Sequence, residues 1–290
     1  MASVLLLGLL VMTCLCMGTS LAESPDPAYD ENYEILWGGN RASSLDGGKE
    51  IQLSMDNSSG SGFGSKLDYG SGFFKMRIKL HSNTSNHDEL DFEFLGNKQG
   101  RPIILQTNIF INGEGNREQR IKLWFDPFAD FHTYGILWNP YQLAFFVDET
   151  PIRVFANKTS MGISYPTQPM QILASIWNGE DWATDGGKTK TNWTYAPFKA
   201  HYQGFDVQGC SSTSPSCSSD GLWWNASKYR RLSDSQMGAY EKVKKNYMTY
   251  NYCTDRSSMH PFSSISSLLY IYTPDLTQIN ATADHLNCAK

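Results

Sequence analysis

The stretch from residue 87 to residue 95, HDELDFEFL, limits the possible folds more than any other part of the chain. Acidic and apolar residues alternate along it, so that Glu89, Asp91 and Glu93 occupy every second position. Successive side chains of a β-strand point to opposite faces of a sheet, so the apolar residues must enter a core while the three carboxylates lie side by side on the other face. The stretch therefore predicts a strand with one buried face and one acidic face.

Alternation with period two continues from about residue 63 to residue 177, and no fixed-period repeat occurs. Strands are predicted over 103–111, 120–125, 132–138, 143–148, 152–155 and 170–177. In the first of these, Leu105 and Ile109 share one face, and Gln106 and Asn108 share the other. The run GSGFG at 60–64 lacks the spacing of a dinucleotide fingerprint and predicts a flexible turn before a strand. Short strands at this spacing predict an all-β sandwich or barrel.

One helix is predicted in the C-terminal quarter of the chain. Either Ser233 or Ser235 is its N-cap. The apolar residues that recur there at spacings of three and four are Met237, Tyr240, Val243 and Tyr247. This pattern is typical of a short helix that packs one face on the body of a protein.

The first 22 residues contain the apolar run LLLGLLV and end with small residues where a signal peptidase cleaves. The run is too short to span a membrane, so we expect a cleaved signal peptide over residues 1–22 and a secreted protein. Sequons for N-glycosylation agree with secretion, and the candidate positions are Asn57, Asn83, Asn157, Asn192, Asn225 and Asn280.

Removal of the signal peptide leaves four cysteines, an even number that suits two disulfides in a secreted chain. Four cysteines allow three connectivities. Local pairing of Cys210 with Cys217, and of Cys253 with Cys288, is favoured because it avoids long crossing loops. A zinc site is disfavoured, since there is no C-x-x-C and no histidine at ligand spacing beside these thiols.

The charge distribution excludes nucleic acid as a partner, because the chain has a net charge of -5 and no block of Lys or Arg. Three familiar catalytic motifs are also missing from the sequence: the Gly-x-Ser-x-Gly elbow, His-Glu-x-x-His and the Walker loop. The chemistry is therefore expected on the acidic strand.

Glu89 and Glu93 are four residues apart, so their Cα atoms lie ~13 Å apart along a strand. If the two side chains lean together, their carboxyl groups can approach the ~5–5.5 Å separation found in a retaining glycosidase. One carboxylate would attack the anomeric carbon, and the other, kept protonated by its charged neighbours, would protonate the leaving oxygen. Asp91 would hold the nucleophile by a hydrogen bond. Two other interpretations stay open. One is a solvated sheet face. The other is a calcium site, although three acids on one flat strand lack the wrapping loop that supplies carbonyl ligands. We expect no metal and no cofactor.

Residues 87–95 closely resemble the signature of the plant xyloglucan endotransglucosylase/hydrolases, members of glycoside hydrolase family sixteen. The similarity continues through 115–120, 123–127, 131–139, 147–153 and 177–184, and resumes at 223–225 and 247–256. It implies a curved antiparallel β-jelly-roll sandwich with an open cleft over residues 23–208. It also implies a small disulfide-stapled C-terminal extension with a short helix over residues 209–290, divergent after 256.

By the same resemblance, Glu89 is the nucleophile, Glu93 the acid/base and Asp91 the assisting carboxylate, with His87 only beginning the strand. The implied sugar-binding positions are Gln106, Asn108, Arg120, Trp177, Trp182, Gly186 and Arg256. The implied protein is a monomeric, secreted enzyme of the cell wall or apoplast. It cuts the β-1,4-glucan backbone of xyloglucan with retention and transfers the glycosyl-enzyme to another xyloglucan chain or to water.

Two departures of the sequence from the family pattern bear on the fold. Beyond Arg256 it is longer than the family tail and unlike it, so the resemblance does not extend to Cys288. Relatives also have a further strand between a segment like 72–80 and the acidic strand, where this chain has only residues 81–86. About one strand's worth of sequence is missing. This gives a second hypothesis, in which a catalytically impaired sandwich binds wall polysaccharide without cleaving it.

Overall fold

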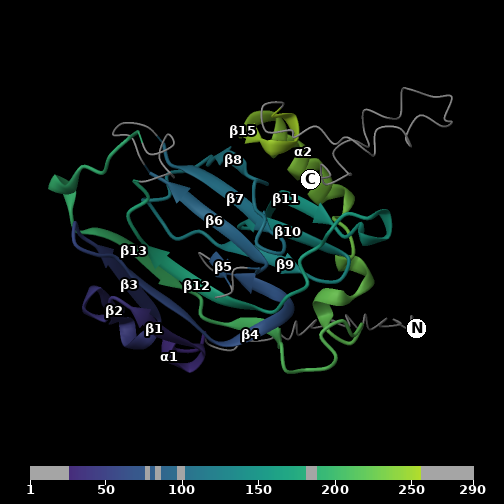
Figure 1. The fold of residues 1–290 in the computed structure, drawn as a ribbon, viewed down its shortest axis with the longest axis horizontal. Helices are drawn as coiled ribbons and strands as arrows, with labels where there is room; N and C mark the ends of the chain where they lie inside the picture. The colour runs from purple at the N-terminus through teal and green to yellow at the C-terminus, as the bar shows by residue number, and fades with distance from the viewer. Residues whose placement is uncertain (1–25, 76–78, 82–85, 97–101, 181–187, 256–290) are drawn as a thin grey trace, which may run out of the picture.

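The computed structural model describes residues 26–75, 79–81, 86–96, 102–180 and 188–255 (Figure 1). Most strands of the described part belong to one large sheet that folds back on itself to form two layers. Aromatic contacts between the layers, described below, identify the space between them as the core. The predicted all-β sandwich is confirmed. No helix in the described ranges is both long and apolar enough to cross a membrane.

We call the layer that contains the acidic strand the front layer and the other the back layer. The front layer contains, in spatial order, β1 (Tyr33–Trp37), the first half of β4 (Ser61–Lys75), β12 (Met170–Ile176), β5 (Lys79–His81), β6 (Glu89–Leu95), β7 (Ile104–Phe110), β8 (Gln119–Lys122) and β15 (Met248–Asn251). The back layer contains β14 (Val207–Ser211), the second half of β4, β9 (Tyr134–Trp138), β10 (Gln142–Val147) and β11 (Thr150–Ala156). A separate sheet contains β13 (Phe198–Gln203), β3 (Glu50–Met55) and β2 (Ala42–Leu45), and the two α-helices are α1 (Tyr29–Asn32) and α2 (Asp234–Asn246).

Strand β4 belongs to both layers because it is 15 residues long. Its residues 61–69 pair with β12, and its residues 72–75 pair with β9. The predicted flexible turn over residues 60–64 is wrong, since residues 61–64 already lie in this strand. A Cβ atom at Gly62 would lie 2.5 Å from Nε1 of Trp37, so glycine is needed where the indole packs on the backbone.

The core is built from aromatic side chains that meet between the layers. Phe92 of β6 contacts Phe145 of β10 edge-on, with ring centroids 5.2 Å apart, and Phe94 contacts Tyr134 of β9 at 4.9 Å. Leu90 is also fully buried. Burial of each such side chain contributes roughly 1.5–3 kcal/mol to folding. The apolar face of the alternating stretch thus enters the core as predicted.

A buried arginine crosses this core. The guanidinium of Arg153, on β11, donates from Nη1 to the carbonyl and hydroxyl oxygens of Thr107 on β7, both at 3.0 Å, and from Nη2 to the carbonyl of Arg117 at 2.6 Å. It also lies 5.8 Å from the ring of Tyr252. Burial lowers the pKa of Arg153, while nearby tyrosines and Glu118 oppose that shift. Arg153 therefore ties the back layer to the front layer.

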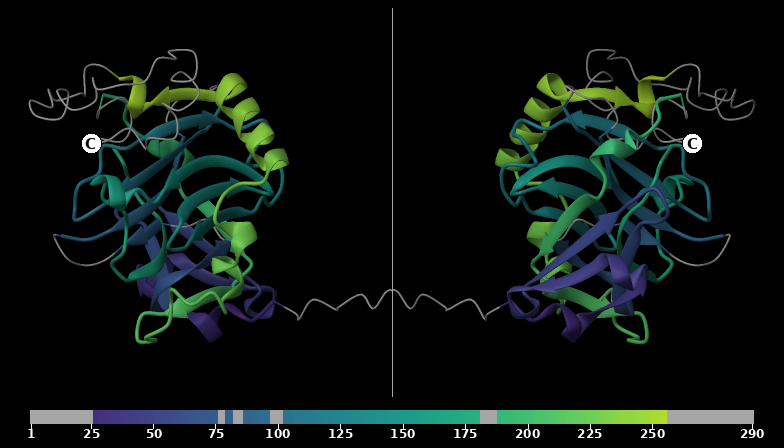
Figure 2. Two further views of the ribbon diagram at one scale, coloured as in Figure 1. Left: turned by 90° about the vertical axis from the view of Figure 1, so that its right-hand side faces the viewer. Right: turned by 90° about the vertical axis from the view of Figure 1, so that its left-hand side faces the viewer.

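The segment after β14 covers the outer face of the back layer. Helix α2 lies on the outside of the strands (Figure 2) and buries Tyr240 and Val243. Ser233 is its N-cap, with Gln236 completing a capping box, so the predicted helix is confirmed. The indole of Trp224 donates to Ser71 Oγ at 3.1 Å. These contacts attach the extension to β4 and to its neighbours in the back layer.

The cysteine predictions have different outcomes. Cys210 and Cys217 form the predicted disulfide. Cys253 is also disulfide-bonded, but its expected partner Cys288 lies outside the described residues, so that pairing stays a prediction.

Strand β5 lies beside β6, where the family pattern indicated missing sequence. It is only three residues long. Lys79 pairs with Asp91 and Leu80 with Leu90, and β12 pairs with the other edge of β5. Because β7 borders β6 on its far side, residues 90 and 91 have a strand neighbour on both sides. The shortened sequence does not leave this part of the acidic strand at a sheet edge.

The sequon asparagines differ in accessibility. Asn225 is 0% exposed and donates through Nδ2 to the carbonyls of Cys217 and Ser219, so the folded chain cannot accept a glycan there. Asn157 donates to the Pro140 carbonyl. Asn57 and Asn192 are both exposed. The expected signal peptide (1–22), Asn83 and Asn280 lie outside the described residues.

Candidate active site

The three carboxylates of β6 occupy the outer face of the front layer. Glu89 and Asp91 are only 3% and 2% exposed, and Glu93 is half-buried. Asp91 lies opposite Asn108 on β7, and Glu93 lies opposite Gln106. The predicted polar faces of β6 and β7 therefore form one continuous surface.

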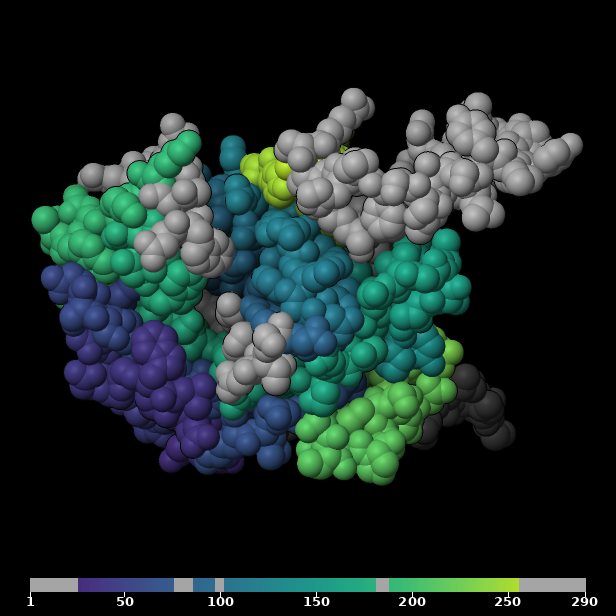
Figure 3. Space-filling view, in the orientation of Figure 1, coloured from purple at the N-terminus to yellow at the C-terminus, as the bar shows by residue number. Residues whose placement is uncertain are grey.

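A row of side chains runs from Glu93 across β7 and β8 to β15. Gln106 donates from Nε2 to Glu93 Oε1 at 3.0 Å and accepts at Oε1 from Arg120 Nε at 2.7 Å. The Arg120 guanidinium lies 5.3 Å from the ring of Tyr250. The strand registers pair Gln106 with Arg120, and Arg120 with Tyr250, so the row follows adjacent strands directly. Figure 3 shows yellow residues near 250 beside the blue residues of the central strands.

Asn108 is oriented differently from its neighbour in this row. Its Oδ1 accepts from the backbone N–H groups of Ile109 at 2.9 Å and Arg117 at 3.1 Å, and its Nδ2 donates to Glu118 Oε1 at 3.4 Å. It is nearly buried. Asn108 thus fixes the segment before β8 and aligns Glu118, which sequence reasoning did not single out.

His87 contacts the first carboxylate. Its Nε2 lies 2.8 Å from Glu89 Oε2, and its ring stacks on Phe110 with centroids 5.9 Å apart. Our sequence analysis placed His87 outside the site. The sequence did contain a signal for this contact: residues 87, 89, 91 and 93 are at every second position and therefore share one face of an extended strand.

Asp88 lies between His87 and Glu89, out of step with the residues that share the carboxylate face, and it has a structural role. One oxygen accepts from the backbone N–H groups of Thr167 at 2.6 Å and Gln168 at 2.8 Å, and the other accepts from Asn112 N at 2.9 Å. These bonds anchor the start of β6 to the loop before β12. The anchor fixes where the carboxylate face begins.

Comparisons with known proteins agree with this arrangement. Residues 29–195 match the glycosyl hydrolases family 16, and residues 218–262 match the xyloglucan endo-transglycosylase (XET) C-terminus. The putative xyloglucan endotransglucosylase/hydrolase protein 1 of Arabidopsis thaliana is 53% identical over 248 residues, covering 80% of this chain and 84% of that protein. Xyloglucan endotransglucosylase/hydrolase protein 2 of the same plant is 55% identical over 247 residues, covering 79% and 85%. The chain belongs to the xyloglucan endotransglucosylase/hydrolases.

The comparison with xyloglucan endotransglucosylase/hydrolase protein 1 also bears on the missing sequence. Since 80% of 290 residues is about 232, about 16 of the 248 compared positions have no counterpart in this chain. A shortfall of that size agrees with the loss of a strand and its turns.

Other residues expected in the site of this xyloglucan endotransglucosylase/hydrolase are only partly described. Trp177, directly after β12, is 40% exposed, whereas Trp182, Gly186 and Arg256 lie outside the described residues. Within the described ranges, no cluster of three or more His, Cys, Asp or Glu side chains is arranged to hold a metal ion.

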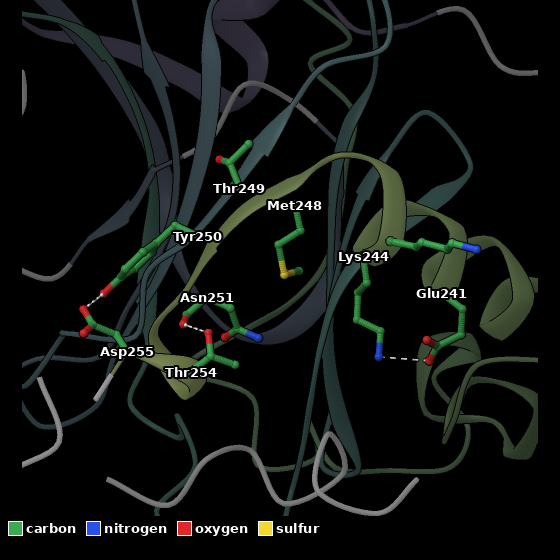
Figure 4. A pocket seen from close by; sticks show the side chains of 9 residues that line it. Glu241, Lys244, Met248, Thr249, Tyr250, Asn251, Thr254 and Asp255 are labelled. Atoms are coloured by element: carbon green, nitrogen blue, oxygen red, sulfur yellow. Dashed lines mark hydrogen bonds and ion pairs between the residues drawn. The ribbon is translucent and has the colours of Figure 1, made fainter. Parts of the chain in front are cut away.

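A hollow of about 800 Å³ lies at the far end of the row, between α2 and β15 (Figure 4). Tyr250 and Asp255 point toward one another in its lining, and the Tyr250 hydroxyl donates to Asp255 Oδ2 at 3.0 Å. Burial raises the pKa of Tyr250, and the bond to Asp255 raises it further. The hollow contains none of the β6 carboxylates, so we place the chemistry on β6 and not here.

Proposed function

We propose that this protein cleaves the β-1,4-glucan backbone of xyloglucan with retention and transfers the new end to a second xyloglucan chain or to water. The observation that carries the proposal is the placement of Glu89, Asp91 and Glu93 on one polar face of β6, backed by Gln106 and Arg120. The names of the relatives support xyloglucan as the substrate.

In the first step, Glu89 attacks the anomeric carbon and the bond from that carbon to the leaving oxygen breaks. Glu93 gives its proton to that oxygen, so the leaving sugar chain departs neutral and the donor half stays esterified to Glu89. In the second step, the Glu93 carboxylate takes a proton from the incoming hydroxyl, which displaces Glu89. Asp91 lies between them on the strand and orients the nucleophile.

A hydrogen bond assists both steps. Gln106 Nε2 donates to Glu93 Oε1 at 3.0 Å and so holds the carboxyl of the proposed acid/base in a defined orientation. We assign Gln106, Asn108, Arg120 and Trp177 to sugar binding, together with Trp182, Gly186 and Arg256.

We further propose that the protein is a secreted monomer of the cell wall, with glycans on the accessible sequons. The expected signal peptide and the substrate support this location. No observation favours the alternative of an impaired binding module, because β6 retains its carboxylates and its residues 90 and 91 have a strand neighbour on each side.

The test is incubation of the secreted protein with xyloglucan and labelled xyloglucan oligosaccharides, with separate measurement of polymer-bound label and new reducing ends. Glu89→Ala should lose both activities, and azide should restore cleavage with inverted product configuration. Glu93→Ala should still cleave aryl glycosides whose leaving groups need no protonation. Loss of activity to a chelator with recovery on adding calcium would favour the calcium site instead.

A further inference from the structure

One aromatic side chain of the C-terminal extension contacts the polar row beside the catalytic strand. Tyr250 lies in β15, directly opposite Arg120 of β8, with its ring 5.3 Å from the guanidinium carbon. Asp255 accepts the Tyr250 hydroxyl at 3.0 Å. The ring is therefore held at its hydroxyl while its body contacts the cation.

Arg120 needs such a restraint, because it is a long and exposed side chain with a defined task. Its Nε donates to Gln106 Oε1 at 2.7 Å. A guanidinium over an aromatic face is attracted by the ring quadrupole, and contact with the ring limits the rotamers of the arginine. Tyr250 thus favours the conformation in which Nε reaches Gln106.

Arg120 in turn decides which end of the Gln106 amide faces Glu93. The guanidinium has donors only, so it must bind the amide oxygen, and the amide nitrogen is left for Glu93 Oε1 at 3.0 Å. A rotated amide would point its oxygen at the carboxylate, which has no proton to donate when ionised. The state of Gln106 therefore depends on Arg120.

We propose that Tyr250 is a positioning residue for the acid/base Glu93, acting through Arg120 and Gln106. The proposal rests on the proposed function. It gives the C-terminal extension a task in proton transfer, in addition to its cover of the back layer.

The test compares Tyr250→Leu with Tyr250→Phe, which keeps the ring over Arg120 but loses the bond to Asp255. Each variant is assayed for kcat and KM on xyloglucan and on aryl xyloglucan oligosaccharides with good leaving groups. We expect Tyr250→Leu to lower kcat on xyloglucan about tenfold, with KM changed less than twofold and first-turnover release of the aryl group changed less than threefold, because a good aryl leaving group needs no proton in the first step. Tyr250→Phe should lose no more than threefold on either substrate.

Two controls make the result specific. Tyr247→Leu removes a nearby ring that packs on Trp124, 5.4 Å away, and should show no dependence on the leaving group. In a double-mutant cycle, Tyr250→Leu should have little further effect in an Arg120→Leu background, since residues that act through one another are not additive. If Tyr250→Leu does not fold, Tyr250→Met takes its place because its volume and flexibility let it fill the site.

Three results would overturn the proposal. Equal losses on both substrates, or a rise in KM alone, would mean that Tyr250 contacts the sugar or only supports the fold. Wild-type kinetics in a folded Tyr250→Leu variant would show that Arg120 is held without the ring. If the wild-type protein neither cleaves nor transfers xyloglucan in this assay, the proposed function fails as well, which separates that failure from the failure of this inference alone.

Discussion

Strands β6 and β10 meet in the core through Phe92 and Phe145 but differ on their outer faces. The outer face of β6 has three carboxylates and a polar row beside it. Every residue of β10 is buried, because its outward Ala144 and Phe146 lie in an apolar cluster with Trp224, Leu232 and Tyr240 of the extension. The outer face of a strand thus reflects what covers it: protein over the back layer and, by our proposal, polysaccharide over the front layer.

The comparison implies that substitutions in the two strands have separable effects. By our proposal, catalysis requires the neighbouring acids of the front layer, whereas the back layer is packed against the extension. Changes on the β6 face should therefore remove activity without loss of stability, and changes in β10 should do the reverse.

The largest effect is expected for Glu89→Gln. Removal of the proposed nucleophile should lower kcat by about 10⁴-fold or more. The melting temperature should stay the same or rise, because one of three adjacent carboxylates loses its charge. Transfer assays and thermal unfolding on one preparation test this. A large drop in melting temperature would erase the distinction between the strands.

Phe145→Ala tests the prediction for β10, the second strand of the comparison. Loss of this buried ring should reduce the free energy of unfolding by about 3–5 kcal/mol, as measured in urea. Activity per folded molecule should remain within about twofold at a temperature where the variant is folded. Phe128→Ala is the control, since Phe128 is 80% exposed and its loss should cost less than about 0.5 kcal/mol. Equal destabilisation by both variants would contradict this prediction.

A smaller effect is expected for the disulfide that closes the extension. Cys210 and Cys217 are separated by 7 residues, and chain entropy for so short a loop gives about 2.5 kcal/mol of stabilisation. The double variant Cys210→Ser, Cys217→Ser should lose that amount in unfolding experiments and retain transfer activity. An active-site defect in the folded double variant would show that the extension and the front layer are more tightly coupled than we infer.

The smallest effect concerns Asp56, which belongs to neither strand. Hydrogen bonds from Ser58, together with Arg41, lower the pKa of Asp56. A depressed folded pKa stabilises the protein above the unfolded value near 3.9, and this contribution disappears as the pH falls through the folded pKa. Asp56→Asn should therefore lower the melting temperature slightly at pH 7 and progressively less below about pH 4. A pH-independent difference would exclude this charge effect.

The sequence predicted the features that depend on local pattern. Alternation placed Gln106 and Glu93 on one face, and a cap at Ser233 or Ser235 with the apolar spacing after it located α2. It did not predict that β4 belongs to both layers, because glycines at 60–64 indicate a turn until the Trp37 indole packs on them. The contacts of His87, Arg153 and Tyr250 join strands distant in sequence or depend on side-chain reach, and no local period encodes them.

The Arg153 guanidinium has a consequence for cooperativity. Its partners are carbonyls on β7 and before β8, together with the Tyr252 ring just after β15. Opening any one of these segments would leave the cation without that partner in a medium that cannot solvate it. Local fluctuations of the extension are therefore suppressed until the whole sandwich opens. Amide hydrogens of β7 and β15 should exchange with solvent as one unit, at the rate of global unfolding, and a protease should find no stable intermediate in which the extension alone has detached.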